Sequence, residues 1–369
     1  MKITIEKQEF MEAINRAVKA VPTKTTMSIM ECFLLEAYGN EIKLTANDFE
    51  LGIETKICGM VLENGSVALN AKLLSDIIRK MPENSIYLET DERWNTTLTC
   101  EKCVFHLNGQ DGASFTPIQI IAKDRAITLK QKILKDMIKK TIFSVSKNDK
   151  SKLMTSINIL INNDQCMRMT ALDGHRIAIR YADISTPIKE KVNVNIPGKS
   201  MDEVGKLLSD DEEEDVILYL EDSHVLFQIG QTLVTSRLVD GEYYRVDQMI
   251  SSDWSTKLTV GRVALANAID RAALFIRTED KKPVKFDIRE TEVSIMGDSP
   301  FGSLKEELDV KKEGKNMLIA FNPYYLMDCL KVIDDESIEW CMTNPKAPAY
   351  IRNDEAGYLY LILPVNIGQ

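Results

Sequence analysis

The sequence has few of the residues on which enzymes commonly depend. It holds three histidines in 369 residues, and its seven cysteines, at 32, 58, 100, 103, 166, 329 and 341, are odd in number and scattered. No stretch approaches the roughly 18 apolar residues of a membrane span. The first ten residues carry charges where a secretion signal needs an apolar run. These absences favour a cytoplasmic protein without structural disulfides.

Motifs for cofactors and metals are also missing. The sequence has no GxGxxG, HExxH or GxSxG pattern. PGKS (197–200) ends like a phosphate loop, but Asn193 stands where that loop needs glycine, so Lys199 and Ser200 are predicted to begin a helix. Cys100 and Cys103 form one CxxC with no second pair. Two cysteines in strands are favoured over a zinc site, and no cofactor is expected.

The DGHR motif is the strongest candidate for chemistry. Asp173 and Gly174 lie between two alternating runs, CMRMTAL and RIAIRYA, and Asp-Gly is a strong signal for a turn between strands. The alternative is a hydrolase in which His175 is the base, Asp173 orients it and Arg176 clamps a phosphate. No nucleophile accompanies these residues, so the turn is favoured.

Three segments of the chain resemble one another. They are residues 2–21, 126–145 and 257–276, which align on Thr4, Thr128 and Thr259. Each is typical of a short alternating strand followed by an amphipathic helix of about three turns. Chance similarity among amphipathic helices is the alternative. A pattern that occurs three times at nearly constant spacing favours an internal repeat.

A second strand–helix pattern recurs inside each copy, at residues 66–82, 194–210 and 318–334. Alternating runs such as SIYLET, VILYLE and SIEWCM follow it and predict antiparallel strands. We therefore predict an α+β protein of three similar domains, each built from two strand–helix–strands units. The expected domains are residues 1–124, 125–253 and 254–369.

The charges are unevenly distributed. The net charge of −10 argues against loose binding of nucleic acid over the whole surface. Six predicted helical segments, residues 6–24, 71–81, 130–147, 199–206, 262–277 and 323–331, hold nineteen Lys and Arg against nine Asp and Glu, a net of +10 that leaves −20 for the rest. Helices that face one way would form a basic lining that attracts phosphates. The helix propensity of Lys and Arg explains part of this excess. SDDEEED (209–215) is interpreted as a solvated loop.

Five motifs, in this order and at this spacing, resemble those of one family: KITIEKQEFMEAI (2–14), ALDGHRIAI (171–179), LVDGEYY (238–244), FNPYYLMDCL (321–330) and YLILPVNI (360–367). Over essentially its whole length the sequence resembles the beta subunit of bacterial DNA polymerase III, the sliding clamp. The resemblance implies a DNA clamp fold in which two copies join head to tail as a pseudo-sixfold ring, with helices inside and strands outside. It implies a non-catalytic processivity factor for DNA replication that encircles duplex DNA without reading its sequence. A DNA-independent protein scaffold and the hydrolase are the alternatives.

The resemblance also implies sites for DNA and for ring closure. DNA contacts are expected at three lysines that match family positions, and five further cations are candidates from their place on helices: Lys24, Lys72 and Lys199, then Arg79, Lys135, Lys139, Lys140 and Arg271. The homodimer interface is expected to bring Phe105 and Leu107 of one copy against Leu274 and Phe275 of the other.

The resemblance assigns the DGHR turn to a partner site. It is expected to wall an apolar groove that takes short peptides from the polymerase III catalytic subunit, the clamp loader and repair proteins, with donors from His175 and Arg176 for peptide carbonyls. The expected groove residues are Ile157, Leu172, Gly174, His175, Arg176, Ile177, Met249, Tyr325, Leu361, Leu363, Pro364 and Val365. Leu172, Tyr244 and Asn366 differ from the residues usual in the family, and Gly368 and Gln369 extend the tail. These differences predict an altered subpocket and therefore an altered preference among peptides.

Overall fold

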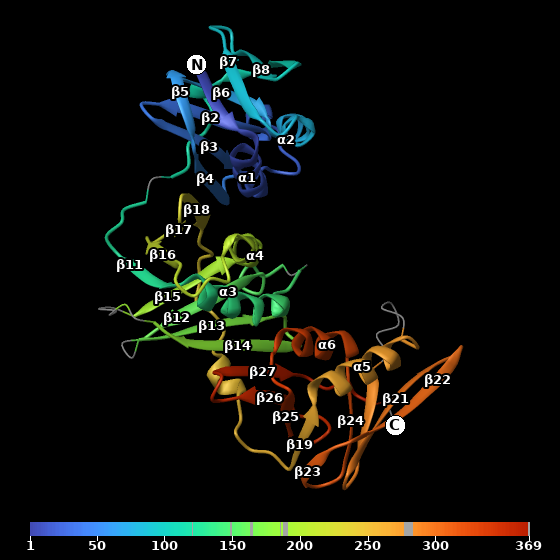
Figure 1. The fold of residues 1–369 in the computed structure, drawn as a ribbon. Helices are drawn as coiled ribbons and strands as arrows, with labels where there is room; N and C mark the ends of the chain where they lie inside the picture. Colours follow the sequence, from blue (N-terminus) through green and yellow to red (C-terminus); the bar gives the residue numbers. More distant parts are fainter. Residues whose placement is uncertain are drawn as a thin grey trace. The chain divides into compact units, whose positions relative to one another are not determined.

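The computed structural model describes residues 1–119, 121–147, 150–162, 165–184, 186, 191–276 and 283–367. Within these residues the chain forms six α-helices and four sheets, and all strand pairs are antiparallel (Figure 1). The chain divides into two compact units. Unit 1 consists of Met1–Lys132 and Glu203–Leu238, and unit 2 consists of Ile133–Asp202 and Val239–Gln369.

The sheets of unit 1 contain five and nine strands. The five-stranded sheet has the order β5 (Gly59–Glu63), β1 (Lys2–Glu6), β7 (Ser85–Thr90), β8 (Asn95–Cys100), β9 (Cys103–Asn108). The nine-stranded sheet has the order β10 (Gln110–Asp111), β6 (Gly65–Asn70), β2 (Cys32–Tyr38), β3 (Glu41–Asn47), β4 (Leu51–Ile57), β18 (Thr232–Arg237), β17 (His224–Ile229), β16 (Asp215–Leu220), β11 (Ala126–Lys130). Because β4 pairs with β18, strands far apart in the sequence belong to one sheet.

The sheets of unit 2 contain nine and four strands. The nine-stranded sheet has the order β15 (Val192–Pro197), β12 (Ser156–Ile161), β13 (Cys166–Leu172), β14 (Arg176–Asp183), β27 (Tyr358–Ile362), β26 (Ala349–Asn353), β25 (Ser337–Met342), β19 (Thr256–Gly261), β23 (Lys311–Gly314). The four-stranded sheet has the order β22 (Gly302–Asp309), β21 (Glu292–Ser299), β20 (Val284–Ile288), β24 (Met317–Phe321). Here β14 pairs with β27 and joins segments about 180 residues apart.

Each of the six helices follows directly on a strand. They are α1 (Lys7–Ala17) after β1, α2 (Ala71–Lys80) after β6, α3 (Gln131–Lys139) after β11, α4 (Gly198–Leu207) after β15, α5 (Arg262–Ala273) after β19 and, two residues beyond β24, α6 (Pro323–Val332). Three strands follow each helix, and the next strand leads into the next helix. The short strands β5, β10 and β23 are extra to this pattern. The predicted α+β fold with six strand–helix–strands units is confirmed.

Local sequence explains where the helices lie. In α1 the buried residues include Phe10, Ala13, Ile14 and Ala17, the spacing of one helical face. Asn70 caps α2 by accepting a hydrogen bond from the backbone N–H of Leu73, and α6 begins with a proline after a capping asparagine. The predicted helix start at PGKS is confirmed because α4 begins at residue 198.

Three helices are shorter than the sequence analysis predicted. α1 ends at Ala17 and a 3₁₀ turn, Val18–Ala20, follows it. α3 ends at Lys139 before the 3₁₀ turn Ile142–Ser144, and α5 ends at Ala273. The six observed helices therefore hold thirteen Lys and Arg against eight Asp and Glu, a net of +5 rather than +10. The prediction overestimated the charge because it included flanking turns. Its last helical residue in the fifth segment, Arg277, lies outside the described residues, as do Gly368 and Gln369.

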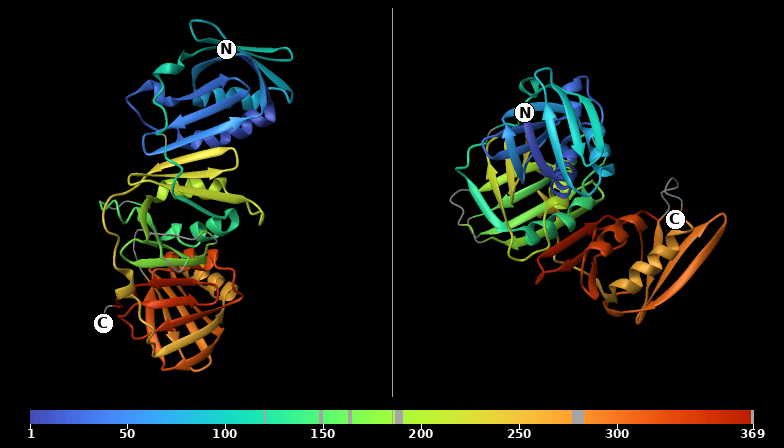
Figure 2. Two further views of the ribbon diagram at one scale, coloured as in Figure 1. Left: turned by 90° about the vertical axis from the view of Figure 1, so that its left-hand side faces the viewer. Right: turned by 45° about the horizontal axis from the view of Figure 1, so that its top comes forward.

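The cores lie between the helices and the sheets. In unit 2, α5 and α6 pack side by side, which the second view in Figure 2 displays in orange and red. Trp340 is fully buried there, with its ring centroid 5.2 Å from those of Phe286 and Phe321. Among the described residues, no helix is long and apolar enough to cross a membrane.

Candidate functional site

The DGHR motif forms the predicted turn between β13 and β14. Asp173 Oδ1 accepts hydrogen bonds from the backbone N–H groups of His175 (3.0 Å) and Arg176 (3.2 Å). Gly174 has a φ of +83°, a conformation that residues with a side chain rarely adopt. The turn is therefore held by its own aspartate and leaves the His175 side chain exposed.

Arg176 has a structural role that the sequence analysis did not predict. Its side chain is 7% exposed. The guanidinium donates to Asp173 Oδ2 (2.8 Å), to Asp328 Oδ2 (2.7 Å) and to the carbonyl of Phe143 (2.5 Å), and it stacks 4.3 Å from the ring centroid of Tyr325. The expectation that Arg176 donates to peptide carbonyls is therefore wrong. Its donors fix the turn against α6 and the segment after α3.

The hydrolase alternative has no support in this geometry. One oxygen of Asp173 accepts the two backbone N–H groups and the other accepts Arg176 Nε, so the carboxylate does not orient the imidazole of His175. The imidazole instead stacks on Tyr325, with ring centroids 6.0 Å apart. An exposed ring of this kind suits contact with a partner.

An apolar cluster lies beside the turn. Leu172, Ile177 and Leu361 are 3–5% exposed and pack with Val246 and Tyr350. Ile177 pairs with Leu172 on one side and with Leu361 on the other, so the three side chains share one face of the sheet.

Exposed apolar side chains lie next to this cluster. Met249 is 48% exposed and Leu363 is 39% exposed. Met249 is tied to the cluster through its carbonyl, which accepts from Tyr350 Oη. Buried leucine and isoleucine thus form a floor, and methionine and leucine at its border are available to a partner.

Ile157 does not belong to this surface, and its prediction is wrong. In the register of β12 with β13, Asn158 stands opposite Thr170, which shares its face with Leu172. Because side chains alternate along a strand, Ile157 points to the other face, where it is fully buried.

The C-terminal tail forms one border of the surface. The backbone N–H of Leu363 donates to the carbonyl of His175 (2.9 Å), and that of Val365 donates to the carbonyl of Ala320 (2.8 Å). The tail is therefore fixed to the DGHR turn and to β24, and Pro364 between these bonds limits its backbone further. Pro364, Val365 and Tyr325 are half-buried.

A second border is a segment that we call the strap, residues 239–250. It contains the 3₁₀ turn Val246–Met249. Val246 is 1% exposed within the apolar cluster, and Tyr243 and Tyr244 pack against the cluster with their rings edge to face. Burial raises the pKa of Tyr243 above its ordinary value. The sequence analysis named two strap residues, Met249 as a groove residue and Tyr244 as a difference from the family, and did not predict that the segment forms a border of the surface.

Most of the predicted DNA-contacting cations are exposed. Lys24, Lys72 and Lys199 are exposed, Lys72 and Lys199 near the N-termini of α2 and α4, and Lys24 in the loop after α1. Arg79 pairs with Asp76 (3.2 Å) and Lys139 lies 3.8 Å from Asp334, with all four side chains largely exposed. Such pairs leave a cation accessible to phosphate.

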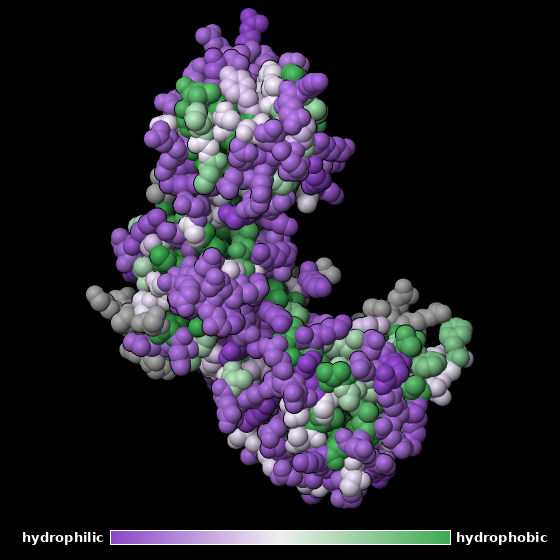
Figure 3. All heavy atoms as spheres, in the orientation of Figure 1, coloured by the Kyte–Doolittle hydropathy of each residue, from purple (hydrophilic) through white to green (hydrophobic). Residues whose placement is uncertain are grey.

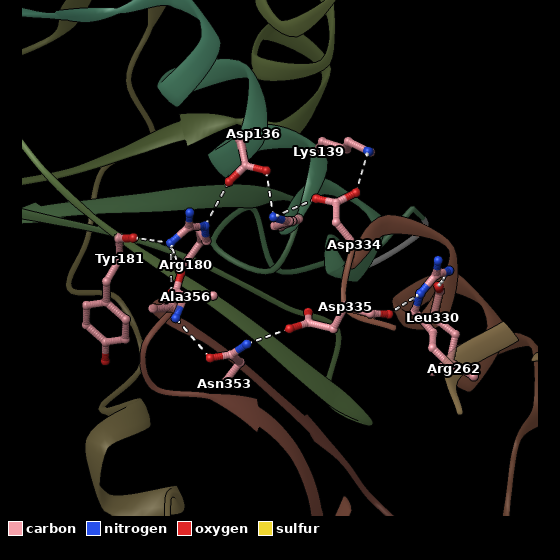
Figure 4. A network of polar contacts seen from close by, with 12 residues as sticks. Asp136, Lys139, Arg180, Tyr181, Arg262, Leu330, Asp334, Asp335, Asn353 and Ala356 are labelled. Carbon is pink, nitrogen blue, oxygen red and sulfur yellow. Dashed lines mark hydrogen bonds and ion pairs between the residues drawn. The ribbon is translucent and has the colours of Figure 1, made fainter. Parts of the chain in front are cut away.

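Lys140 is not accessible, and its prediction is wrong. Its side chain is 11% exposed, and its Nζ lies 2.7 Å from Asp136 and 3.1 Å from Asp334. Asp136 also accepts from Arg180 Nε at 2.8 Å (Figure 4). The amine is committed to a network within unit 2, so a phosphate would have to displace two carboxylates.

The remaining two cations have different surroundings. Lys135 is half-buried on α3. Arg271 is half exposed and forms a two-point ion pair with Glu306 of β22. That hydrogen bond lowers the pKa of Glu306. Arg271 therefore ties α5 to β22 and is a weaker candidate for DNA.

The predicted interface residues differ strongly in exposure. Leu274, just after α5, is 81% exposed, and Phe275 is half-buried beside Gly302. In the other unit, Phe105 of β9 is half-buried and Leu107 is 8% exposed. Figure 3 displays hydrophobic side chains gathered over α5 and the β21–β22 hairpin, where Phe301 is 78% exposed.

Both groups of predicted interface residues lie in or near the last strand of a sheet. β9 is the last strand of the five-stranded sheet, and β22 is the last strand of the four-stranded sheet. Among the described residues neither has a strand partner on its outer side. Each edge therefore offers backbone donors and acceptors to another chain.

The seven cysteines are free thiols. Cys100 and Cys103 stand opposite each other in the β8–β9 hairpin, as the strand interpretation predicted. No group of three potential metal ligands occurs among the described residues.

Comparison with known proteins identifies the family. Models of the N-terminal, central and C-terminal domains of the DNA polymerase III beta subunit match residues 1–119, 128–244 and 247–366. The chain belongs to the DNA polymerase III beta subunit family. It is 32% identical to a beta sliding clamp of Staphylococcus epidermidis over 99% of both chains.

Solved structures of beta subunits have the same fold. A protein of Eubacterium rectale, assigned as a DNA polymerase III beta subunit, has 42% identity, a TM-score of 0.96 and full coverage of both chains. The DNA polymerase sliding clamp of Bacillus subtilis has 30% identity, a TM-score of 0.96 and full coverage of both. Sliding clamps are non-catalytic processivity subunits, and the DGHR geometry of this beta subunit agrees with that role.

Proposed function

We propose that two copies of this chain join head to tail in a closed ring around duplex DNA, and that the ring tethers the replicative polymerase. One observation carries the proposal: models of all three beta subunit domains match the chain in order. The same order of strands and helices recurs in each third of the chain, which agrees with three similar domains. The proposed domains are residues 1–124, 125–253 and 254–369. The proposed location is the cytoplasm, where bacterial DNA is replicated.

The proposed DNA lining is built from exposed lysines on or near helices. Lys24, Lys72 and Lys199 are its main members, and Arg79, Lys135, Lys139 and Arg271 are secondary. Cations of this kind attract phosphates without reading bases. Because a closed ring is retained by its topology, the lining needs only weak contacts, and weak contacts permit sliding.

The proposed ring closure pairs β9 of one copy with β22 of the other. Both are edge strands, and Phe105 and Leu107 on one side meet Leu274 and Phe275 on the other. Backbone hydrogen bonds across the seam would extend each sheet into the next copy, and the apolar side chains would exclude water beneath them. The contact is heterologous and closes after two copies.

The proposed partner site is the surface beside the DGHR turn. Its floor is Leu172, Ile177 and Leu361, its borders are Met249, Leu363 and Pro364, and His175 and Tyr325 offer stacked rings. Short extended peptides from the polymerase catalytic subunit, the clamp loader and repair proteins would insert apolar side chains there. A fixed floor with adaptable borders suits several related peptides.

The decisive experiment measures retention on DNA. Labelled protein is loaded on nicked circular plasmid with a clamp loader and ATP, isolated by gel filtration, and then treated with an enzyme that cuts the plasmid once. The protein should elute with the circle and leave after linearisation. Retention on the linear product contradicts the proposal, because it shows direct binding of DNA without a closed ring. No retention on the circle, although the loader is active on another clamp, also contradicts it and favours a DNA-independent scaffold.

Charge reversal tests the lining separately. The Lys72→Glu/Lys199→Glu variant should load roughly tenfold less, because each phosphate contact contributes to a steep electrostatic term. The matched control is Lys315→Glu/Lys346→Glu, which changes the net charge equally at exposed positions away from the helices. Equal loading of both variants contradicts the assigned lining.

A further inference from the structure

A hollow in unit 2 lies beside the proposed peptide surface. It is lined by Asn158, Leu160, Arg168, Lys191, Asn193, Glu242, Tyr243, Tyr244, Arg245 and Asp247. Tyr243 and Tyr244 line the hollow and also pack on the apolar cluster of Leu172, Ile177 and Leu361. The hollow and the peptide surface therefore share a wall.

The two sites also share one face of the sheet. Along β13, Arg168 and Leu172 are four residues apart, so their side chains point to the same side. The register places Leu160 and Tyr181 beside Arg168, and Ile177 beside Leu172. At about 3.3 Å per residue, Arg168 lies about 13 Å along the strand from the apolar floor. An extended peptide covers this distance in about four residues.

One donor of the Arg168 guanidinium, the Nε–H group, has no acceptor among the described residues. Its side chain is 15% exposed, and its NH1 pairs with Asp247 of the strap at 2.5 Å. Its Nε is buried. A buried guanidinium donor without an acceptor is costly, and a carboxylate is the acceptor that fits its planar fork.

Hydrogen bonds within the chain hold the walls of the hollow in place before any ligand binds. Asn158 Nδ2 donates to Asn193 Oδ1 (2.8 Å) and Asn195 Oδ1 (3.0 Å). Asn195 in turn donates to the carbonyl of Gly241 (2.8 Å) in the strap. The strap is thus held at one end by asparagines and at the other by the Arg168–Asp247 pair. A ligand would not have to order these groups, which favours affinity.

The lining favours an anion. Arg168, Lys191 and Arg245 outnumber Glu242 and Asp247, and Asp247 is already paired with Arg168. We propose that Arg168 receives a carboxylate of the docked peptide about four residues from its apolar anchor. The carboxylate is either an Asp or Glu side chain or a free C-terminus. This inference rests on the proposed partner site and adds a requirement for acidic peptides.

The test uses the full chain and synthetic peptides. Fluorescein-labelled peptides carry a fixed pair of apolar anchors, and Glu or Gln is placed three, four or five residues to either side. A second set ends at those positions with a free or an amidated C-terminus. Dissociation constants come from fluorescence anisotropy at constant ionic strength. At one spacing, Glu or the free C-terminus should bind roughly tenfold more tightly than its neutral partner, as expected for a charge-assisted hydrogen bond.

Variants separate a direct contact from a structural one. Arg168→Gln should abolish the preference for the acidic peptide, whereas Asp247→Asn should increase it because the competing carboxylate is gone. Lys315→Gln, at an exposed lysine outside the hollow, is the control for general charge and should change the preference less than twofold. If Arg168 only fastens the strap, Arg168→Gln weakens acidic and neutral peptides by the same factor, which overturns the inference.

The proposed function and this inference fail in different ways. Equal affinity of acidic and neutral peptides at every spacing overturns the Arg168 assignment and leaves the apolar site intact. No binding of any peptide, or binding that Leu363→Asp does not weaken, overturns the partner site and the inference together.

Discussion

At the scale of single residues, Lys and Arg side chains have two different roles in this chain: some are buried and hold the fold together, and others are exposed and available to a ligand. Arg176 and Lys140 are buried among carboxylates and carbonyls, whereas Lys72 and Lys199 are exposed near helix N-termini. The family resemblance gave Arg176, Lys72 and Lys199 as ligand-binding candidates, and position on a predicted helix gave Lys140. Burial, by contrast, depends on contacts with α6 and the segment after it, more than 130 residues away. The pattern around a single cation therefore does not reveal its role.

Arg176→Ala should lower the free energy of unfolding by about 3 kcal/mol, because it leaves Asp173, Asp328 and the Phe143 carbonyl without their shared donor. The matched control is Arg289→Ala, whose side chain is 58% exposed and pairs with Asp287. It should cost less than about 1 kcal/mol. Urea unfolding followed by circular dichroism measures both. Similar losses for both variants would contradict the structural role of Arg176.

At the scale of elements, the strand–helix pattern carries most of the fold. Alternation and the Asp173–Gly174 signal predicted β13, β14 and their turn, and helical spacing predicted the cores of all six helices. Two things could not be read in this way. The first is the end of α1, because local turns decide whether the helix continues past Ala17. The second is the face of β12 and β13 that the strap covers, because residues 239–250 are distant in sequence from these strands. The second reason accounts for the error at Ile157.

The network of Figure 4 ties α3 and β14 to the segment after α6. Burial alone would raise the pKa of Asp334, but its hydrogen bond with Lys140 and the charges of Lys140 and Lys139 lower it. A carboxyl whose pKa is lowered in the folded state stabilises the fold above its unfolded pKa, about 3.9, and loses that effect as pH falls through the folded value.

Asp334→Asn should therefore lower stability at pH 7 by less than about 1 kcal/mol, since Asp334 is largely exposed. The difference from the unmodified chain should persist at pH 5 and shrink as the pH falls below about 4. Urea midpoints at pH 7, 5, 4 and 3 measure it. A difference that grows on acidification would contradict the assigned direction of the pKa shift.

At the scale of the whole molecule, the repeat and the family resemblance predicted the architecture, while the ring seam stays a proposal. Both proposed partners in the seam are edge strands with apolar neighbours. The most exposed of those neighbours, Leu274, has few contacts within its own chain, so its substitution should act on association rather than on folding.

Leu274→Asp should convert the dimer to a monomer at micromolar concentration, because a buried unpaired carboxylate in the seam would be strongly unfavourable. Val263→Asp, also on an exposed position of the α5 region at 55% exposure, is the control and should remain dimeric. Sedimentation velocity gives the masses. An unmodified chain that sediments as a monomer at this concentration would refute the ring.

The pairing of β4 with β18 and of β14 with β27 has a mechanical consequence. At each of these places five residue pairs form a continuous backbone ladder, Leu51–Thr55 with Thr232–Ser236 and Arg176–Arg180 with Tyr358–Ile362. Such ladders resist bending and shear, and they yield only by partial unfolding. An enzyme that opens the assembly to admit a DNA strand would therefore meet the least resistance where one polypeptide meets another.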